Sequence, residues 1–329
     1  MPQTTQPRSP RKLRLVQQEM QKLCRSATIE PHPGQRGGRM RSSSHRPDRR
    51  APEPQSAKDA DVNPLHPCPR RAWAAQAAPM TRPLFDPSLL PVRQARAEAL
   101  GGDFFLHERA FDECLDRILT VRREFAGAWL LGAERPGWRE RLASFGITQV
   151  GFARLDADLP DFRPDLCISI GALDTAEDIP PLLAAIRHML APDGLFIGAF
   201  AGGHSLPKLR SAMAAADLVD GYARPHFHPP IDPASFGGLL TGAGFVDPVA
   251  DIDRVTLTYA SMAALVRDLR GMGATNRLLE RSRRPISRRA LAAAKENFAA
   301  ASTNGRTKEI LEIIYFAAWS PQDPAQLQG

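Results

Sequence analysis

Residues 165–200 read DLCISIGALDTAEDIPPLLAAIRHMLAPDGLFIGAF and contain one complete strand–helix–strand unit. The short apolar runs 165–170 and 195–200 predict two buried strands. Residues 179–190 between them predict a helix that ends at a Pro-Asp-Gly turn. Because both strands are apolar throughout, we expect both of their faces to be covered, which is typical of a parallel sheet.

The same alternation continues on both sides of this unit. Upstream, the patterns predict helices over 104–123 and 138–145 and strands over 128–132 and 147–155. Downstream, they predict helices near 205–217 and 233–241, a strand over 255–259, a largely helical stretch over 261–301 and a strand over 309–319. This order predicts a doubly wound α/β fold with a mostly parallel sheet. The last strand is long and apolar, as expected of a strand inserted into an existing sheet.

The positive charge of the chain is concentrated at its N-terminus. The 329 residues carry a net charge of +7, but residues 1–79 alone carry 15 Lys and Arg against 6 Asp and Glu. The remainder, 80–329, therefore has a net charge of −2, which disfavours nucleic acid as a partner of the folded part. We expect 1–79 to be a disordered, basic, Pro- and Arg-rich tail and 80–329 to be the folded domain. Two alternatives stay open for the tail: a transit peptide, or translated leader sequence before a true start at Met80.

Cysteine spacing and hydropathy point to a reducing compartment without a membrane anchor. The four cysteines show no C-x-x-C spacing, so neither a disulfide framework nor a zinc site is expected. No apolar run approaches 18 residues, and no apolar core of a secretory signal is present. The sequence predicts a cytoplasmic protein that binds no metal and has no membrane span.

Several segments of 80–329 resemble a known family. Residues 190–210, LAPDGLFIGAFAGGHSLPKLR, and 251–276, DIDRVTLTYASMAALVRDLRGMGATN, are similar to two groups of class I S-adenosylmethionine-dependent methyltransferases. These are the BioC-type malonyl-acyl-carrier-protein O-methyltransferases and the respiratory complex I assembly proteins of the methyltransferase fold. The Phe85-Asp86 pair and residues 305–319 also match. The resemblance implies a Rossmann-like, seven-stranded sheet with an antiparallel last strand. It also implies S-adenosylmethionine bound at the carboxyl ends of the first strands, and a small-molecule or protein-carried acceptor.

The cofactor turn departs from the family pattern. The first strand of the family ends in an acidic residue followed by Gly-x-Gly-x-Gly, which lets the backbone approach the cofactor closely. Here Leu130 replaces the acid, Glu134 and Pro136 replace two of the glycines, and only Gly132 stays in register. Gly132 is a cofactor-binding candidate, and a plain turn is the alternative. We expect S-adenosylmethionine binding to be weak or absent.

The region after the first strand is short. Residues 128–170 span 43 positions, whereas four strands of ~5 residues with three crossovers of ~10–12 need about 50 or more. One strand–helix unit is therefore expected to be missing. Asp156, at a predicted strand end, is the remaining candidate for the carboxylate that binds the cofactor ribose in this family. A solvated turn residue is the alternative interpretation.

Three residues are candidates for a substrate site, and no residue is nominated for catalysis. Asp174 lies where the family often has histidine, His204 follows the Gly-Gly turn after the fourth strand, and His226 opens the segment HFHPP. The His-x-His pair in that segment lacks a nearby third ligand for a metal.

Two functions remain open from the sequence. The first is a methyltransferase with an unknown acceptor, and the second is a non-catalytic relative that keeps the fold as a binding or assembly module. A nicotinamide-dependent oxidoreductase is disfavoured because no G-x-G-x-x-G follows any predicted strand.

Overall fold

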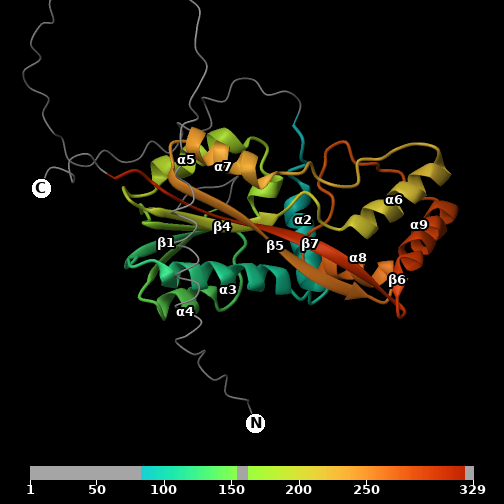
Figure 1. Ribbon diagram of the computed structural model, residues 1–329, viewed down its shortest axis with the longest axis horizontal. Helices are drawn as coiled ribbons and strands as arrows, with labels where there is room; N and C mark the ends of the chain where they lie inside the picture. Colours follow the sequence, from blue (N-terminus) through green and yellow to red (C-terminus); the bar gives the residue numbers. More distant parts are fainter. Residues whose placement is uncertain (1–82, 154–161, 323–329) are drawn as a thin grey trace, which may run out of the picture. The chain divides into compact units, whose positions relative to one another are not determined.

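A computed structural model describes residues 83–153 and 162–322, all within the unit Arg70–Gly329 (Figure 1). The predicted tail, the Met80 start and the cofactor candidate Asp156 lie outside the described residues. The described chain forms one mixed sheet in the order β2-β1-β3-β4-β7-β5, with the short strand β6 paired to β7. The predicted α/β class is confirmed.

The first four strands are parallel and short. Their bounds are β1 Gly127–Gly132, β2 Gln149–Ala153, β3 Leu166–Ile170 and β4 Leu195–Ala201. β1 pairs with both β2 and β3, and β3 pairs with β4. β1, β3 and β4 are almost wholly buried, as their uninterrupted apolar sequences predict.

The last long strand is inserted between two others. β7, Arg306–Trp319, pairs antiparallel with β4 on one side and with β5, Val246–Tyr259, on the other. β5 begins nine residues before the predicted strand, because a register shift between Val246 and Val249 and a positive φ at Asp247 interrupt its start. The seventh strand, β6 (Ser302–Thr303), is a two-residue extension that turns into β7.

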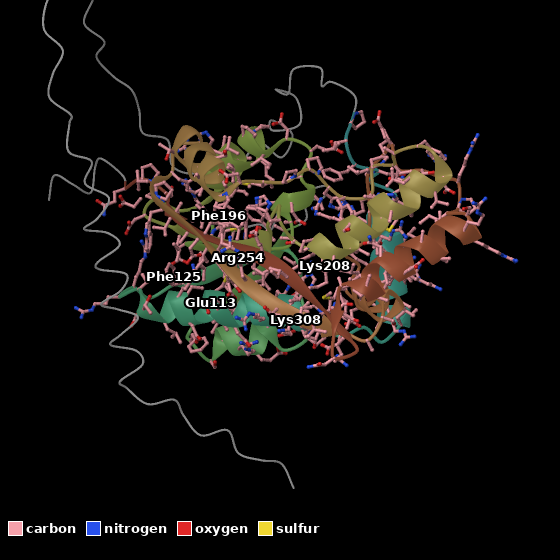
Figure 2. The ribbon with its side chains drawn as sticks, turned by 45° about the vertical axis from the view of Figure 1, so that its right-hand side comes forward. Glu113, Phe125, Phe196, Lys208, Arg254 and Lys308 are labelled. Atoms are coloured by element: carbon pink, nitrogen blue, oxygen red, sulfur yellow. The ribbon has the colours of Figure 1, made fainter. Side chains whose placement is uncertain are left out.

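Helices cover both faces of the sheet (Figure 1). One face packs against α3, Phe105–Thr120, and α4, Trp138–Ala143, and the other against α5, Ile179–Met189, and α7, Pro233–Gly242. Phe196 of β4, labelled in Figure 2, is fully buried in the second layer and stacks on Phe245 at 5.4 Å. These two buried layers are what a doubly wound fold requires.

Within the described residues no strand lies beyond β2 in the sheet, but residues 154–161 are outside them, so the missing or collapsed strand–helix unit stays a prediction. β2 ends at Ala153 and β3 begins at Leu166, so twelve residues join two strands that flank β1. A further strand with its own crossover helix needs more than ~15 residues. β2 is consequently the edge of the described sheet, and the count of seven strands is reached only through β6.

The helices of the C-terminal half also differ from the prediction. The predicted helical stretch 261–301 contains two helices, α8 Met262–Gly271 and α9 Arg288–Ala300, separated by irregular backbone. Ser261 and Ser287 cap these helices by accepting the N–H of Ala264 and Ala290. Sequence analysis also missed α2, Leu89–Ala99, whose apolar periodicity is weak and whose only buried residue is Ala97.

A buried carboxylate joins β7 to α6, Pro207–Asp220. Glu309 accepts the backbone N–H groups of Lys208 (3.2 Å) and Leu209 (2.5 Å), which are free donors at the start of the helix. Figure 2 labels Lys208 at this end of α6 and Lys308 on β7. The N-terminus of α6 is therefore satisfied from within the protein.

Candidate functional site

The candidate site is the edge of the sheet at which the parallel strands end. β1, β3 and β4 end at Gly132, Ile170 and Ala201, and Gly132 and Ile170 are register partners. In open α/β sheets, ligands bind at this carboxyl edge. The loops that follow these strands carry the predicted residues Gly132, Asp174 and His204.

Packing against the loop after β3 requires a glycine at position 132. Its φ is +90°, and a Cβ there would lie 2.6 Å from both Ala172 Cβ and Ile170 O. The neighbouring loop after β3 therefore occupies the space that the missing side chain leaves. Leu130, which stands where the family has an acid, is completely buried in the core.

The rest of the turn after β1 is held by side chains of the protein itself. Glu134 forms an ion pair with Arg139 of α4. The Arg135 guanidinium lies over the Phe104 ring, 3.3 Å from its centroid. Gly137 supplies the left-handed residue before the six-residue α4. The turn is thus a closed arrangement of a carboxylate, two arginines and an aromatic ring.

The first turn of α4 is also anchored. Trp138 is fully buried and stacks on Phe111 of α3 at 4.1 Å, while its indole N–H donates to the Glu108 carboxylate. Together with Ala172 against Gly132, this packing leaves no glycine cradle of the kind that the methyltransferase cofactor needs. The residues present at the turn do not fit S-adenosylmethionine.

Asp174 lies in the short 3-10 helix Leu173–Thr175 after β3. Its Oδ1 atom is buried and accepts no hydrogen bond. Burial raises the pKa of Asp174 to about 6, against the opposing effect of the Arg277 charge. This group is the most perturbed carboxyl of the carboxyl edge, which makes it a candidate for ligand contact.

A short N-terminal segment covers the loop after β3. Phe85 pairs with Leu278 in an isolated antiparallel bridge, and Asp86 N–H donates to Arg277 O at 2.8 Å. The Glu177 carboxylate accepts the backbone N–H groups of Leu84 and Phe85, at 2.8 and 2.7 Å. The Phe-Asp pair noted in the sequence is thereby fixed between Glu177 and residues 277–279.

His228 joins Asp174 and Arg277 in one cluster under this segment. Its Nε2 accepts the Arg277 backbone N–H at 3.1 Å, and its ring meets the Phe85 ring edge-on at 5.1 Å. Burial and then the Arg277 charge lower the pKa of His228 to about 4. His228 is therefore neutral at pH 7.

A second histidine lies at the opposite side of the same loop. His107 of α3 lies against Gly171, since a Cβ at Gly171 would be 3.4 Å from His107 Nε2. Its Nδ1 is buried without a partner. Burial and the nearby Arg135 charge lower the pKa of His107 to about 4, so it is a neutral hydrogen-bonding group and a poor base at pH 7.

The other two predicted substrate residues, His204 and His226, make hydrogen bonds with acidic residues of the protein itself. His204 is exposed, and its backbone N–H donates to Glu312 Oε2 at 3.1 Å; Glu312 also pairs with Arg254, labelled in Figure 2. His226 Nε2 contacts Asp217 Oδ1 of α6 at 3.0 Å. Their role in substrate binding stays a prediction.

Sequence reasoning missed His107 and Arg277, and it considered His228 only as a member of the His-x-His pair. Arg277 follows directly after DLRGMGATN, residues 268–276, which lies in a segment that carries the family resemblance, and that position was the available signal. Among the residues that the structure describes, no group of His, Cys, Asp and Glu has the arrangement of a metal site. No helix in ranges 83–153 and 162–322 is long and apolar enough to cross a membrane.

Comparisons with known proteins place the chain among methyltransferase-like sequences. No family model matches it. "Arginine-hydroxylase NDUFAF5, mitochondrial" of Danio rerio is 29% identical over 283 residues, 77% of this chain and 88% of that protein. A "Malonyl-[acyl-carrier protein] O-methyltransferase" of Xylella fastidiosa is 38% identical over 164 residues, 49% of this chain and 53% of that protein. The human NDUFAF5 protein is 30% identical over 197 residues, 52% of this chain and 57% of that protein.

The chain thus spans most of the zebrafish relative but about half the length of the other two. Among solved structures, a putative methyltransferase from Bacillus halodurans has a TM-score of 0.42 at 10% identity, covering 64% of this chain and 99% of its own. A Haemonchus contortus phosphoethanolamine N-methyltransferase in complex with S-adenosyl-L-methionine has a TM-score of 0.38 at 15% identity, covering 69% and 56%. The predicted resemblance to class I S-adenosylmethionine-dependent methyltransferases is confirmed.

Proposed function

We propose that this chain uses the methyltransferase fold as a binding or assembly module, with weak or no S-adenosylmethionine binding. The observation that carries the proposal is the contact at Gly132, where Ala172 and Ile170 occupy the space that an open cofactor turn would keep free. A fold alone does not fix an activity, so the chemistry must be judged from the site.

Two further features support the same conclusion. Leu130 is buried where a strand-end acid would face a ligand, and Glu134 is paired with Arg139 in the turn. The twelve-residue link between β2 and β3 replaces the unit that supplies the ribose carboxylate in the family. The chain thus departs from the family's cofactor-binding pattern at three places along one edge of the sheet.

The partner is proposed to be a protein or a protein-carried group. The relatives' names refer to an acyl-carrier protein in one group and to arginine hydroxylation in the other. Asp174, His228 and Arg277 would lie at the place where such a group enters, beneath Phe85. Cys114 and Cys167 are free thiols, in keeping with a reducing compartment. We assign the chain to the cytoplasm, whereas the zebrafish and human relatives are named mitochondrial.

A methyl-transfer assay tests this proposal. The full chain is incubated with malonyl-acyl-carrier protein and S-adenosylmethionine that carries a tritiated methyl group. The Xylella fastidiosa enzyme serves as the positive control. We expect no label on the carrier protein above the background without protein, and turnover at the rate of the control enzyme would contradict the proposal.

Retained methyl transfer is the second candidate, and the Asp174 cluster favours it. Asp174 has a buried carboxyl oxygen without a hydrogen-bond partner, and it lies near the loops that carry His228 and Arg277. A polar group of this kind can position a methyl acceptor. Methyl transfer depends mainly on positioning, so it needs no dedicated base. The same assay separates the two candidates, since only this one predicts labelled product.

A further inference from the structure

Four arginines gather where α2 meets α8 and the irregular segment after it. Arg93 and Arg96 lie one turn apart on α2, Arg270 lies in the last turn of α8, and Arg281 lies in the connection to α9. In Figure 1, α2 and α8 lie beside each other near the strand ends of the sheet. We call these four side chains the arginine cluster.

The arginine cluster has few internal partners. Among the described residues, Arg93 donates to Asn276 O at a long 3.4 Å, and Arg96 donates to Thr275 Oγ1 at 3.2 Å. The Nε atoms of both are buried and have no hydrogen-bond partner. Arg281 pairs with Asp86, whereas Arg93, Arg96 and Arg270 make no ion pair with any residue in the described part of the chain. Buried donors without acceptors are costly, and native proteins keep few of them.

Like charges add to this cost. The pKa of Arg93 is lowered by burial and then by the charges of Arg96, Arg281 and Arg270. The cluster therefore places positive charges close enough to repel one another within a folded part that is slightly acidic overall. An anion at this position would relieve the repulsion between the arginines.

The backbone under the cluster is rigid. A Cβ at Gly102, in the segment after α2, would lie 1.9 Å from Gly271 O at the end of α8, so these two backbone segments approach at a distance that only glycine permits. A Cβ at Gly273 would lie 3.7 Å from Arg93 O. The backbone segments that carry the arginines are thus closely packed, and Arg96 and Arg281 are further held by Thr275 and Asp86.

We propose that the arginine cluster is a docking surface for an acidic protein segment. The cluster spans two helices and a connection, which suits several carboxylates in a row better than one small anion. The net charge of −2 on residues 80–329 and the absence of exposed aromatic residues among the cluster argue against nucleic acid. The basic N-terminal tail has the wrong sign to cover it. The inference rests on the proposed binding function and names the chemistry of its partner.

Direct binding to an acidic peptide tests the inference. The full chain is titrated into a fluorescein-labelled peptide of ten glutamates, and hydrogen exchange is followed over α2 and residues 270–284. The double variant Arg93→Gln/Arg96→Gln is compared with a control, Arg122→Gln/Arg306→Gln, which removes two exposed arginines elsewhere. All proteins keep the same basic residues 1–79, and hydrogen exchange over α2 and residues 270–284 reports binding at the cluster separately from binding there. If the double variant fails to fold, the single variant Arg270→Gln, at an exposed position of the cluster, is compared with the control instead.

We expect the peptide to slow exchange in α2 and residues 270–284 and to bind about tenfold more weakly to the double variant than to the control. Arg270→Gln should weaken binding about threefold. Equal affinity of all variants, or unchanged exchange over α2, would overturn the inference. Tighter binding of a 20-nucleotide RNA than of the peptide, or full saturation by inorganic phosphate at the same positions, would also overturn it. None of these readouts depends on S-adenosylmethionine, so the outcome is separate from that of the methyl-transfer assay.

Discussion

Gly132 and Gly137 stand five residues apart in the same turn, and both have positive φ angles, +90° and +86°. Their surroundings differ. A Cβ at Gly137 would meet nothing within 4 Å, whereas one at Gly132 would meet Ala172 and Ile170 at 2.6 Å. The pair therefore separates the cost of backbone strain from the cost of a steric overlap.

We expect Gly137→Ala to lower the free energy of unfolding by about 1 kcal/mol, because the backbone strain acts alone. Gly132→Ala should lower it by about 3 kcal/mol, because the overlap with Ala172 is added. Urea unfolding followed by far-UV circular dichroism measures both. Equal losses in the two variants would mean that the loop after β3 does not fill the space at Gly132.

Asp174 gives a prediction of pH dependence. Its pKa rises from 3.8 to about 6 on folding, so the folded state holds the proton more tightly than the unfolded state. Stability is therefore lost as the pH rises from about 4 to 6, and the loss stays constant above that range. Asp174→Asn should raise the free energy of unfolding by about 1–2 kcal/mol at pH 7.5, with no gain below pH 4.

The control for this measurement is Asp103→Asn, at an exposed position. Unfolding of both variants is compared with the parent protein at pH 4, 6 and 7.5. A gain for Asp174→Asn that does not change with pH would show that its carboxylate is not the source.

At the scale of single residues, sequence reasoning found the loops but not the cluster. Gly132 was identified as the glycine that stays in register with the family's cofactor turn, and Asp174 because it stands where the family often has histidine. His228 and Arg277 lie in irregular segments, and Arg277 comes near Asp174 and His228 only in the folded chain. No local sequence pattern predicts a tertiary contact of this kind.

At the scale of elements, the join between β7 and α6 gives the clearest test. Glu309 is completely buried and accepts two N–H groups at the start of the helix. We expect Glu309→Ala to lower the free energy of unfolding by about 1–3 kcal/mol, because it leaves those donors without an acceptor.

The neighbouring Lys308→Ala, on the exposed side of the same strand, should change stability by no more than about 0.5 kcal/mol. Hydrogen exchange in α6 should accelerate in Glu309→Ala alone. If exchange in α6 is the same in both variants, the cap does not hold the helix.

The elements that the sequence predicted well are those with strong periodicity. The buried strands β1, β3 and β4 and the amphipathic α3 were located to within a few residues. α2 was missed because it buries one alanine and packs through Gly102, so it shows little apolar period. β5 was shortened because it is half exposed at the edge of the sheet and alternates polar residues with apolar ones.

At the scale of the whole molecule, the described chain has the doubly wound plan that the order of its elements predicted, and side chains of the protein fill the turn after β1. The β7 strand is inserted between β4 and β5, and both faces of the sheet are covered, as the order of elements predicted. The missing or collapsed strand–helix unit between β2 and β3 stays a prediction. The sequence could not reveal that Ala172 packs against Gly132, since this contact depends on how two parallel strands are aligned.

Calorimetric titration of the full chain with S-adenosylmethionine tests the central claim most directly. A lost charge-assisted hydrogen bond costs ~1.5–3 kcal/mol, and an occupied glycine turn adds a steric cost. Since 1.4 kcal/mol is tenfold in affinity, binding should be weakened roughly a hundredfold or more. We predict no binding heat in the low micromolar range, and tight one-to-one binding of S-adenosylmethionine would contradict the account.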